Sequence, residues 1–225
     1  MPIGELMMRD LFLNQKIERV LIACESSGVS RRAWNAAGFD CWSIDLLEAD
    51  DAGEKHIVGD ALSVLDEDWD LIIAHPPCTY LCNSGVWMLS EKHIHKDPDR
   101  WEKLDAACAF FRAFWNAPAP RICIENPIPH KYAVQRIGGM KPTQYIQPFE
   151  HGHPESKKTG LWLKGLAPLV PSHLVQKPES GHWANQTPSG QNKLGPSEKR
   201  WKERSKTYEG IAAAMVNQWG LVDYT

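Results

Sequence analysis

Cys78 stands where a thiol could act as a nucleophile. An apolar run ends in "HPPC", and the two prolines stiffen the turn and fix the direction of the residue that follows. A thiolate is a good nucleophile when it is partly exposed near positive charge, whereas an isolated cysteine reads as a small core residue. For Cys78 alone, packing, metal binding and catalysis all stay open.

A carboxyl group follows the next strand-like run, because "RICIENP" places Glu125 and Asn126 directly after apolar residues. A thiol and a carboxyl group from neighbouring strand ends suit one reaction. The thiolate attacks C6 of a pyrimidine, and a protonated carboxyl at N3 stabilises the charge that develops. Glu125 must then hold a proton near neutral pH, which burial would favour. Asn126 is expected to orient Glu125.

Three other strand ends carry groups that suit a nucleotide. The turn Glu25-Ser26-Ser27-Gly28 precedes a helix pattern, whose free backbone N–H groups would face a ligand. Asp45, about 20 residues on, is placed to accept hydrogen bonds from ribose hydroxyls. Asp60 could accept one from an adenine amino group. The G-x-G-x-x-G spacing of a dinucleotide site is absent from the sequence, and each acid alone could simply cap the next helix.

Alternating strand and helix patterns must position these residues. Strand patterns are predicted over 19–24, 40–47, 69–78 and 121–127, with a short strand inside 55–65, and helix patterns up to Gly38, over 100–117 and over 207–220. Near-continuous apolar strands indicate an α/β fold with a mostly parallel sheet and helices on both faces. Ligands bind beyond the carboxyl ends of the strands in such sheets, which is where the acids and Cys78 lie.

The composition is that of a globular chain. Its 225 residues are 43% hydrophobic and 24% charged, with a net charge of -3, which argues against disorder and fits one α/β domain with an accessory segment. The six cysteines lie mostly in apolar strand or helix patterns, as reduced thiols do. Charges interrupt the N-terminal residues, which predicts neither a signal peptide nor a membrane span. We therefore expect a soluble, cytoplasmic protein.

A basic segment with little periodicity covers residues 172–206. Lys and Arg exceed Asp and Glu there by four, in a chain that is net negative. Such a segment suits the phosphates of a polymer, although a solvated loop would have the same composition. We predict a catalytic domain over 17–171, a short target-recognition segment over 172–206, and a C-terminal helix within 207–225 that returns to the catalytic domain.

The motifs, taken in order, resemble those of DNA cytosine-C5 methyltransferases. "HPPC" and "IENP" resemble the family's proline-cysteine and Glu-Asn-Val motifs. "LIACESSG" stands where the family has its glycine loop, "IDLL" at its ribose-binding acid and "GDA" at its Gly-Asp turn. "GHPESKKTGLWL" resembles the Pro-Gln-x-Arg-x-Arg segment, and "SKTYEGIAAAMVNQW" the final helix. The likeness covers roughly residues 19–164 and 205–220, and compact phage and prophage-type members look closest.

The resemblance implies a Rossmann-like, S-adenosylmethionine-dependent methyltransferase fold and methyl transfer to C5 of cytosine in DNA. The substrate would be a duplex with a flipped base or a single strand. Cys78 would be the covalent nucleophile, Glu125 the acid at N3, and Asn126 its partner. The cofactor-binding residues implied by position are Cys24, Glu25, Ser26, Ser27, Gly28, Asp45, Leu46, Asp60, Ala61, His75 and Pro77.

The substrate-binding residues implied by the resemblance are Lys157, Lys158 and Thr159, with Lys158 in place of the arginine that contacts cytosine O2. No metal is expected, and the cell would be a bacterium or a phage-infected host. Serines and a glutamate replace the glycines of the first loop, so transfer of a group larger than methyl stays open. His75 replaces the glycine usual before the prolines.

Three alternatives remain. An amino-methyltransferase would use an Asp/Asn-Pro-Pro-aromatic turn, of which this chain has only the prolines. A pyrimidine mononucleotide enzyme would use the same thiolate attack without a DNA-binding segment. A non-enzymatic zinc module could use Cys78, Cys82, His93 and His95, although the two histidines, at i and i+2, do not share one helix face.

Overall fold

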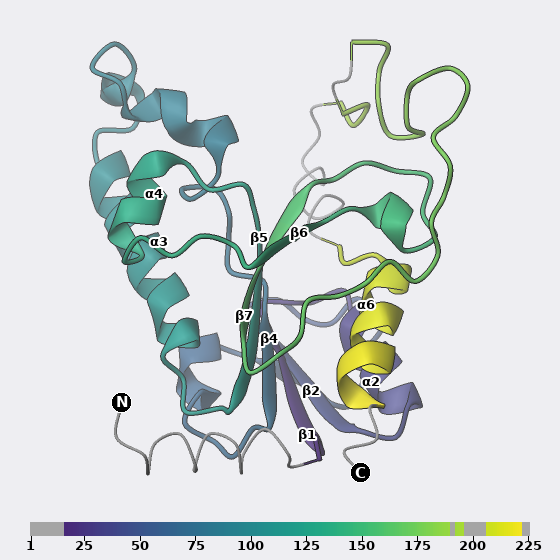
Figure 1. Ribbon diagram of the computed structural model, residues 1–225. Coiled ribbons are helices and arrows are strands. Elements are labelled where there is room, and N and C mark those ends of the chain that lie inside the picture. The colour runs from purple at the N-terminus through teal and green to yellow at the C-terminus, as the bar shows by residue number, and fades with distance from the viewer. Residues whose placement is uncertain (1–15, 190–191, 196–205, 222–225) are drawn as a thin grey trace, which may run out of the picture.

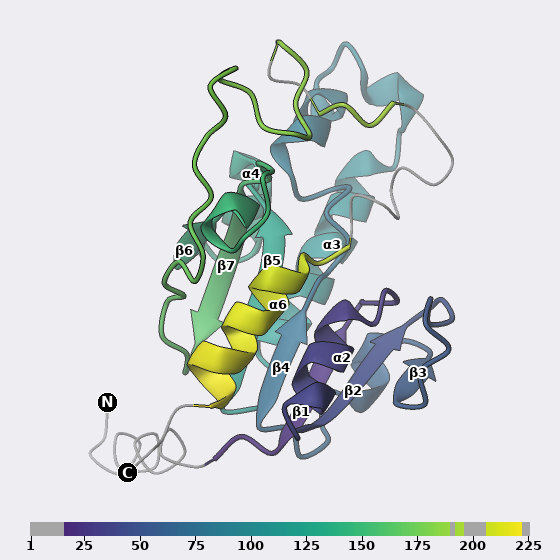
Figure 2. The same cartoon turned by 90° about the vertical axis from the view of Figure 1, so that its right-hand side faces the viewer.

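A seven-stranded sheet forms the centre of the molecule (Figure 1). The computed structural model describes residues 16–189, 192–195 and 206–221. The strand order is β3-β2-β1-β4-β5-β7-β6. The strands are β1 (Arg19–Ala23), β2 (Asp40–Asp45), β3 (His56–Val58), β4 (Leu71–Ala74), β5 (Arg121–Pro127), β6 (Gln144–Ile146) and β7 (Thr159–Lys164). Only β7 runs against its neighbours, β5 and β6, as its reversed arrow in Figure 2 shows.

Helices cover both faces of this sheet. On one face α2 (Val29–Ala36) packs beside α6 (Glu209–Met215), and on the other lie α3 (Arg100–Trp115) and α4 (Lys131–Arg136) (Figures 1 and 2). The remaining helical turns are η1 (Ala61–Val64), η2 (Asn83–Leu89), η3 (Ile94–Lys96), η4 (Pro148–Glu150) and the π-helical turn Val216–Gly220. This mostly parallel sheet between two helical layers confirms the predicted α/β architecture.

The alternation of side chains along each strand explains the two layers. Val20 and Ile22 of β1 belong to the core under α2 and α6, while Leu21 and Ala23 belong to the core under α3 and α4. Because both faces are buried, the central strands carry almost no polar side chains. The long apolar runs seen in the sequence are a consequence of this arrangement.

Most predicted elements match the observed ones, and two strands were not predicted. β5 has the predicted bounds, and α3 ends two residues before the predicted end of its helix. β6 has only three residues, and β7 pairs in the antiparallel direction, so neither fits the strand–helix alternation that indicated the others. The C-terminal helix is α6, and it packs on α2 as part of the hydrophobic core on that face of the sheet.

Residues 172–189 and 192–195 have little regular structure, and Trp183 among them stacks on Phe149 with ring centroids 4.5 Å apart. Four basic residues of the predicted segment 172–206 lie outside the described part of the chain: Lys199, Arg200, Lys202 and Arg204. The three-part division of the chain stays a prediction. Within the described ranges, no helix has the length and apolar character needed to cross a membrane.

Candidate active site

The strand pairing aligns four predicted site residues in one row. Ala23 pairs with Ile44 and Ala74, and Ala74 pairs with Ile124. The next residues on these neighbouring strands are Asp45, Cys24, His75 and Glu125, in the spatial order β2, β1, β4 and β5. The sheet register therefore brings the predicted cofactor acid and the predicted catalytic acid to the same edge.

Cys24 lies close to both predicted cofactor acids. Burial, together with the charges of Asp45 and Asp60, raises the pKa of its thiol to about 12. Each carboxylate also accepts a 3.0 Å hydrogen bond within its own turn, Asp45 from the N–H of Leu47 and Asp60 from that of Leu62. The acids thus cap local turns, as the structural alternative anticipated, and they also gather around one point. Cys24 itself has a positive φ of 59°, which is uncommon outside glycine.

The β1–α2 loop is organised by Glu25 rather than by glycines. One oxygen of this buried carboxyl accepts hydrogen bonds from the Ser27 hydroxyl and from the N–H of Val29, 3.1 Å away, at the start of α2. Its other oxygen is buried without a hydrogen-bond partner among the described residues. Gly28 adopts φ 71°, and a Cβ there would collide with the Asp51 carboxylate, so this glycine is required by both conformation and space.

A cavity of about 430 Å³ opens beside this loop. It brings Ser27 together with the residues that precede α6, where the Thr207 hydroxyl is buried without a hydrogen-bond partner in the described chain. Its lining carries both charge signs: Ser27, Val29, Arg32, Asp50, Asp51, His153, Lys206, Thr207, Tyr208 and Glu209. Apart from Ser27, none of these residues was predicted as a site residue. The only sequence signal for them was the expected return of the last helix to the cofactor site.

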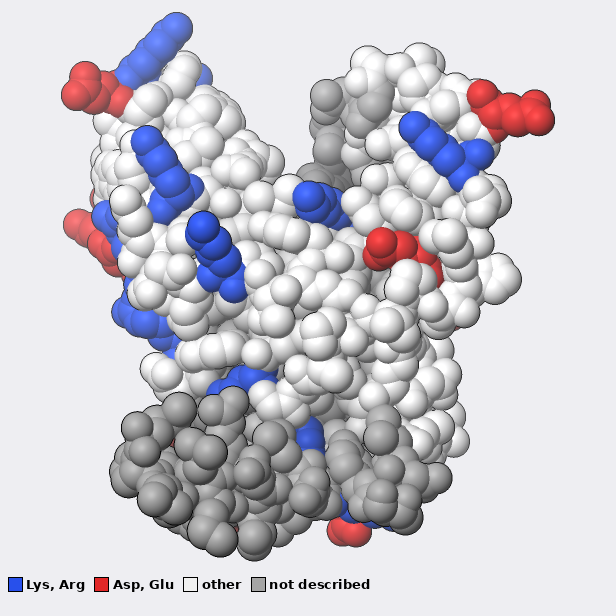
Figure 3. All heavy atoms as spheres, viewed as in Figure 1, with Lys and Arg blue, Asp and Glu red and all other residues white. Residues whose placement is uncertain are grey.

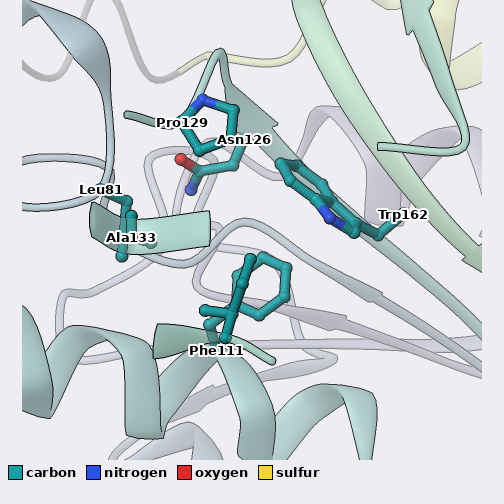
Figure 4. A pocket seen from close by; sticks show the side chains of 7 residues that line it. Leu81, Phe111, Asn126, Pro129, Ala133 and Trp162 are labelled. Carbon is teal, nitrogen blue, oxygen red and sulfur yellow. The ribbon is translucent and has the colours of Figure 1, made fainter. Parts of the chain in front are cut away.

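The turn that carries Cys78 is tied to β5 by Asn126. The Asn126 Nδ2 group donates a 2.7 Å hydrogen bond to the carbonyl oxygen of Pro76. The Asn126 side chain thus contacts the thiol-bearing turn, and it lines a void too narrow for a water molecule, together with Leu81, Phe111, Pro129, Ala133, Ile137 and Trp162 (Figure 4). The void has no room for a ligand, so this side chain positions the turn and does not face the ligand space.

Cys82, which the sequence suggested as a ligand in the zinc alternative, is a second thiol beside Cys78. The N–H groups of Leu81 and Cys82 both donate to the carbonyl of Cys78 at 3.0 Å, and this helical turn places the two cysteines on one side. A hydrogen bond between the two thiols lowers the pKa of Cys82, and the Ser84 hydroxyl, 3.0 Å from its sulfur, adds to the effect. The spacing Cys-x-x-x-Cys was the available signal.

Glu125 is held as a carboxylate, which corrects the expectation that burial would keep it protonated. Burial acts to raise its pKa, but a 2.6 Å hydrogen bond from His75 Nδ1 and the charge of Lys157 outweigh it and lower the pKa to about 2. Both partners are largely buried, with 9% and 14% of their side chains exposed. His75 was predicted as a cofactor contact; its position beside Glu125 was not predicted.

The three predicted substrate residues diverge in space. Lys157 acts electrostatically on Glu125, and Thr159 is a further hydrogen-bonding neighbour of that carboxyl. Lys158 instead places its ammonium 4.5 Å from the ring centroid of Tyr145 on the edge strand β6. Lys157 is therefore the better candidate for a contact near the predicted base, and the prediction for Lys158 finds no support in this geometry.

Of the remaining predicted cofactor residues, Ala61 is buried at the start of η1, whereas Leu46 and Pro77 are exposed. Ser26 accepts a 2.8 Å backbone hydrogen bond from Asp50, which closes the β1–α2 loop against the β2–β3 loop. No group of three or more His, Cys, Asp or Glu side chains in the described residues could hold a metal ion. His93, a ligand in the zinc alternative, packs edge-on against Trp87.

No protein-family model matches the chain, and no curated protein matches it in sequence. Among solved structures the chain is similar to the Entamoeba histolytica methyltransferase EhMeth, with 18% identity and a TM-score of 0.44 over 73% of this chain and 58% of that one. It is also similar to the bifunctional kinase-methyltransferase WbdD, with 10% identity and a TM-score of 0.39 over 76% and 41%. The structure of WbdD with the kinase inhibitor LY294002 has 11% sequence identity and a TM-score of 0.41, over 89% of this chain and 52% of that one. The chain thus spans less than two thirds of each matched protein.

Proposed function

We propose that this chain transfers a methyl group from S-adenosylmethionine to C5 of cytosine in DNA, through a covalent bond between Cys78 and C6. One observation carries the proposal. The turn that bears Cys78 and the strand end that bears Glu125 are neighbours in register, and the Asn126 side chain joins them. A nucleophile and a group for N3 are then held on one rigid edge, which positioning catalysis requires.

The proposed chemistry divides between the two strand ends. The Cys78 thiolate forms a bond to C6, and the electron density displaced from the C5–C6 double bond makes C5 nucleophilic. Glu125 would face N3, where a proton delivered through its carboxyl group stabilises the charge on the ring. After C5 has been substituted, loss of its proton and cleavage of the Cys78–C6 bond restore the aromatic ring.

The residues at the β1–α2 loop fit S-adenosylmethionine. One buried oxygen of Glu25 and the buried hydroxyl of Thr207 have no hydrogen-bond partner among the described residues, so each could bind a polar group of the cofactor. Arg32 and Asp50 line the adjoining cavity, where they could bind the carboxylate and the ammonium of its amino acid group. Asp45 and Asp60 would receive ribose hydroxyls and an adenine amino group. When bound, the cofactor supplies the electrophilic methyl group that C5 accepts.

DNA is the proposed partner because of the shape above the site. In Figure 3 the molecule is hollowed between the part that carries α3 and α4 and the part that carries residues 165–189, and Lys and Arg side chains lie beside the hollow. Lys177 and Lys193 belong to the basic segment, residues 172–206. Cationic side chains around such a groove would neutralise backbone phosphates, and C5 must leave the base stack to reach Cys78.

The test is a covalent trap. DNA that contains 5-fluorocytosine, incubated with S-adenosylmethionine, should give a protein–DNA adduct that survives denaturing electrophoresis. The fluorine at C5 replaces the proton that must be removed before Cys78 can leave, so the covalent bond persists. Cys78→Ser should abolish the adduct, while Cys108→Ser, in the α3 core, should retain it. Full methyl transfer by Cys78→Ser would refute the covalent route. An adduct with free 5-fluoro-dCMP and none with DNA would favour a mononucleotide enzyme.

A further inference from the structure

The pair formed by His75 and Glu125 leaves the proposed reaction without an acid, since Glu125 is stabilised as a carboxylate. We propose that His75 holds the proton for N3 and delivers it through Glu125. The inference rests on the proposed function. His75 Nδ1 lies 2.6 Å from Glu125 Oε2, a charge-assisted distance, and both side chains are shielded from water.

The surroundings of the pair favour a shared proton. His75 Nε2 is buried without a hydrogen-bond partner among the described residues, so the Nδ1–Oε2 bond is the polar contact the ring makes there. The main chain of His75 is fixed as well, because its N–H donates a 2.9 Å hydrogen bond to the carbonyl of Ala23. The ring is therefore held at one distance from Glu125 by the sheet itself.

Other elements contribute the charges that face the pair. Lys157, before β7, and Tyr208, before α6, both interact electrostatically with Glu125. The Cys24 thiol on β1, with its pKa raised by burial and by two acids, stays neutral and adds no charge near neutral pH. Cys123, behind Glu125 on β5, is likewise raised in pKa by burial. In the described chain, His75 Nδ1 is therefore the ring nitrogen that lies within hydrogen-bond distance of Glu125 and can pass a proton to it in the proposed step.

The proton transfer is balanced by bonds that form and break at the pair. As the Cys78–C6 bond forms, the Nδ1–H bond of the His75 imidazolium breaks and an O–H bond forms on Glu125. The carboxyl then gives its proton to N3, and Glu125 returns to a carboxylate beside a neutral imidazole. The charge lost by the imidazolium cancels the negative charge that the thiolate adds to the ring. Departure of Cys78 reverses the transfer.

This role predicts a particular pH profile. Activity falls on the alkaline side as the proton leaves the pair, and it falls on the acid side as the Cys78 thiolate becomes protonated. In His75→Gln the amide can donate to Glu125 but cannot release a proton. The alkaline limb should therefore disappear, and the rate at neutral pH should fall by about 100-fold or more. His173→Gln, an exposed histidine outside the site, should keep the wild-type profile.

The experiment measures single-turnover methyl transfer to DNA from about pH 6 to about pH 10, so that both limbs of the profile are sampled. Thermal unfolding of His75→Gln should match the wild type. A Nδ1–H proton signal at low field in the NMR spectrum, lost in Glu125→Gln, checks the pair without any substrate. An adduct with 5-fluorocytosine DNA but an unchanged alkaline limb in His75→Gln overturns the proton role alone. Absence of the adduct in wild-type protein overturns the proposed function as well.

Discussion

Asn126 on β5 donates a 2.7 Å hydrogen bond from Nδ2 to the carbonyl oxygen of Pro76, two residues before Cys78. This one bond joins the ends of two parallel strands and sets the thiol-bearing turn against Glu125. The adjacent side chain of β5, that of Glu125, pairs with His75. Two consecutive residues of one strand therefore hold the two halves of the proposed active site in place.

Loss of the Asn126 amide should cost both stability and rate. Asn126→Ala leaves the buried Pro76 carbonyl without its donor, so we expect unfolding free energy to fall by about 1–3 kcal/mol. A displaced thiol should also slow methyl transfer by about 100-fold with little change in cofactor affinity. Urea denaturation and single-turnover rates measure the two effects, and Asn83→Ala, an exposed position, is the control. An unaltered rate would remove Asn126 from the positioning role.

Cys82 should influence the reactivity of Cys78. Because the hydrogen bond from Cys78 lowers the pKa of Cys82, the first proton lost from the pair leaves Cys82, and its negative charge then opposes ionisation of Cys78. Cys82→Ala should then increase the alkylation of Cys78 by iodoacetamide at pH 7 by about tenfold, because that charge is removed. Peptide mass spectrometry across a pH series measures it. Equal alkylation rates in wild type and variant would contradict the coupling.

Substitution of Asp45 should weaken cofactor binding and leave the affinity for DNA nearly unchanged. Asp45→Asn removes a charged acceptor for ribose hydroxyls and keeps an oxygen that can accept from Leu47 N–H, so cofactor affinity should drop about tenfold. Asp66→Asn, an exposed acid after η1, provides the matched control. Titration calorimetry with S-adenosylmethionine gives the comparison, and an identical dissociation constant for Asp45→Asn would exclude this contact.

Substitutions of the adjacent residues Lys157 and Lys158 should have different effects on activity. Lys157 faces Glu125, while Lys158 lies over Tyr145. Lys157→Ala should weaken DNA binding or methyl transfer about tenfold, and it should raise the pKa of Glu125 because one lowering charge is removed. Lys158→Ala should have a much smaller effect, as expected for a solvent-facing cation. Similar losses in the two variants would restore Lys158 as a substrate contact.

The strands β1, β4 and β5 were predictable because each is buried on both faces, which requires a continuous apolar run in the sequence. The edge strand β3 is partly exposed and was predicted only as a short strand. β6 and β7 left no such signal. β6 is three residues long, and β7 runs antiparallel after a segment of turns, so its pairing with β5 depends on residues far apart in the chain.

The candidate site was likewise predictable only in part. Residues at strand ends, such as Asp45 and Glu125, were found because parallel strands bring their carboxyl ends to one edge. The cavity residues Arg32, Asp50 and Tyr208 come from loops and from the start of α6, and no local pattern marks them.

The sequence alone determined that a thiol, a carboxyl group and a series of acids follow apolar strands, since local periodicity and proline turns are properties of consecutive residues. Only the tertiary structure decided the protonation of that carboxyl and its partners. Burial alone would have kept Glu125 neutral, but the register of β4 against β5 places His75 beside it, and the hydrogen bond from His75, with the charge of Lys157, outweighs the loss of solvent. Glu125 of "IENP" therefore pairs with His75, the first residue of "HPPC". Neither stretch of sequence by itself indicates this pairing.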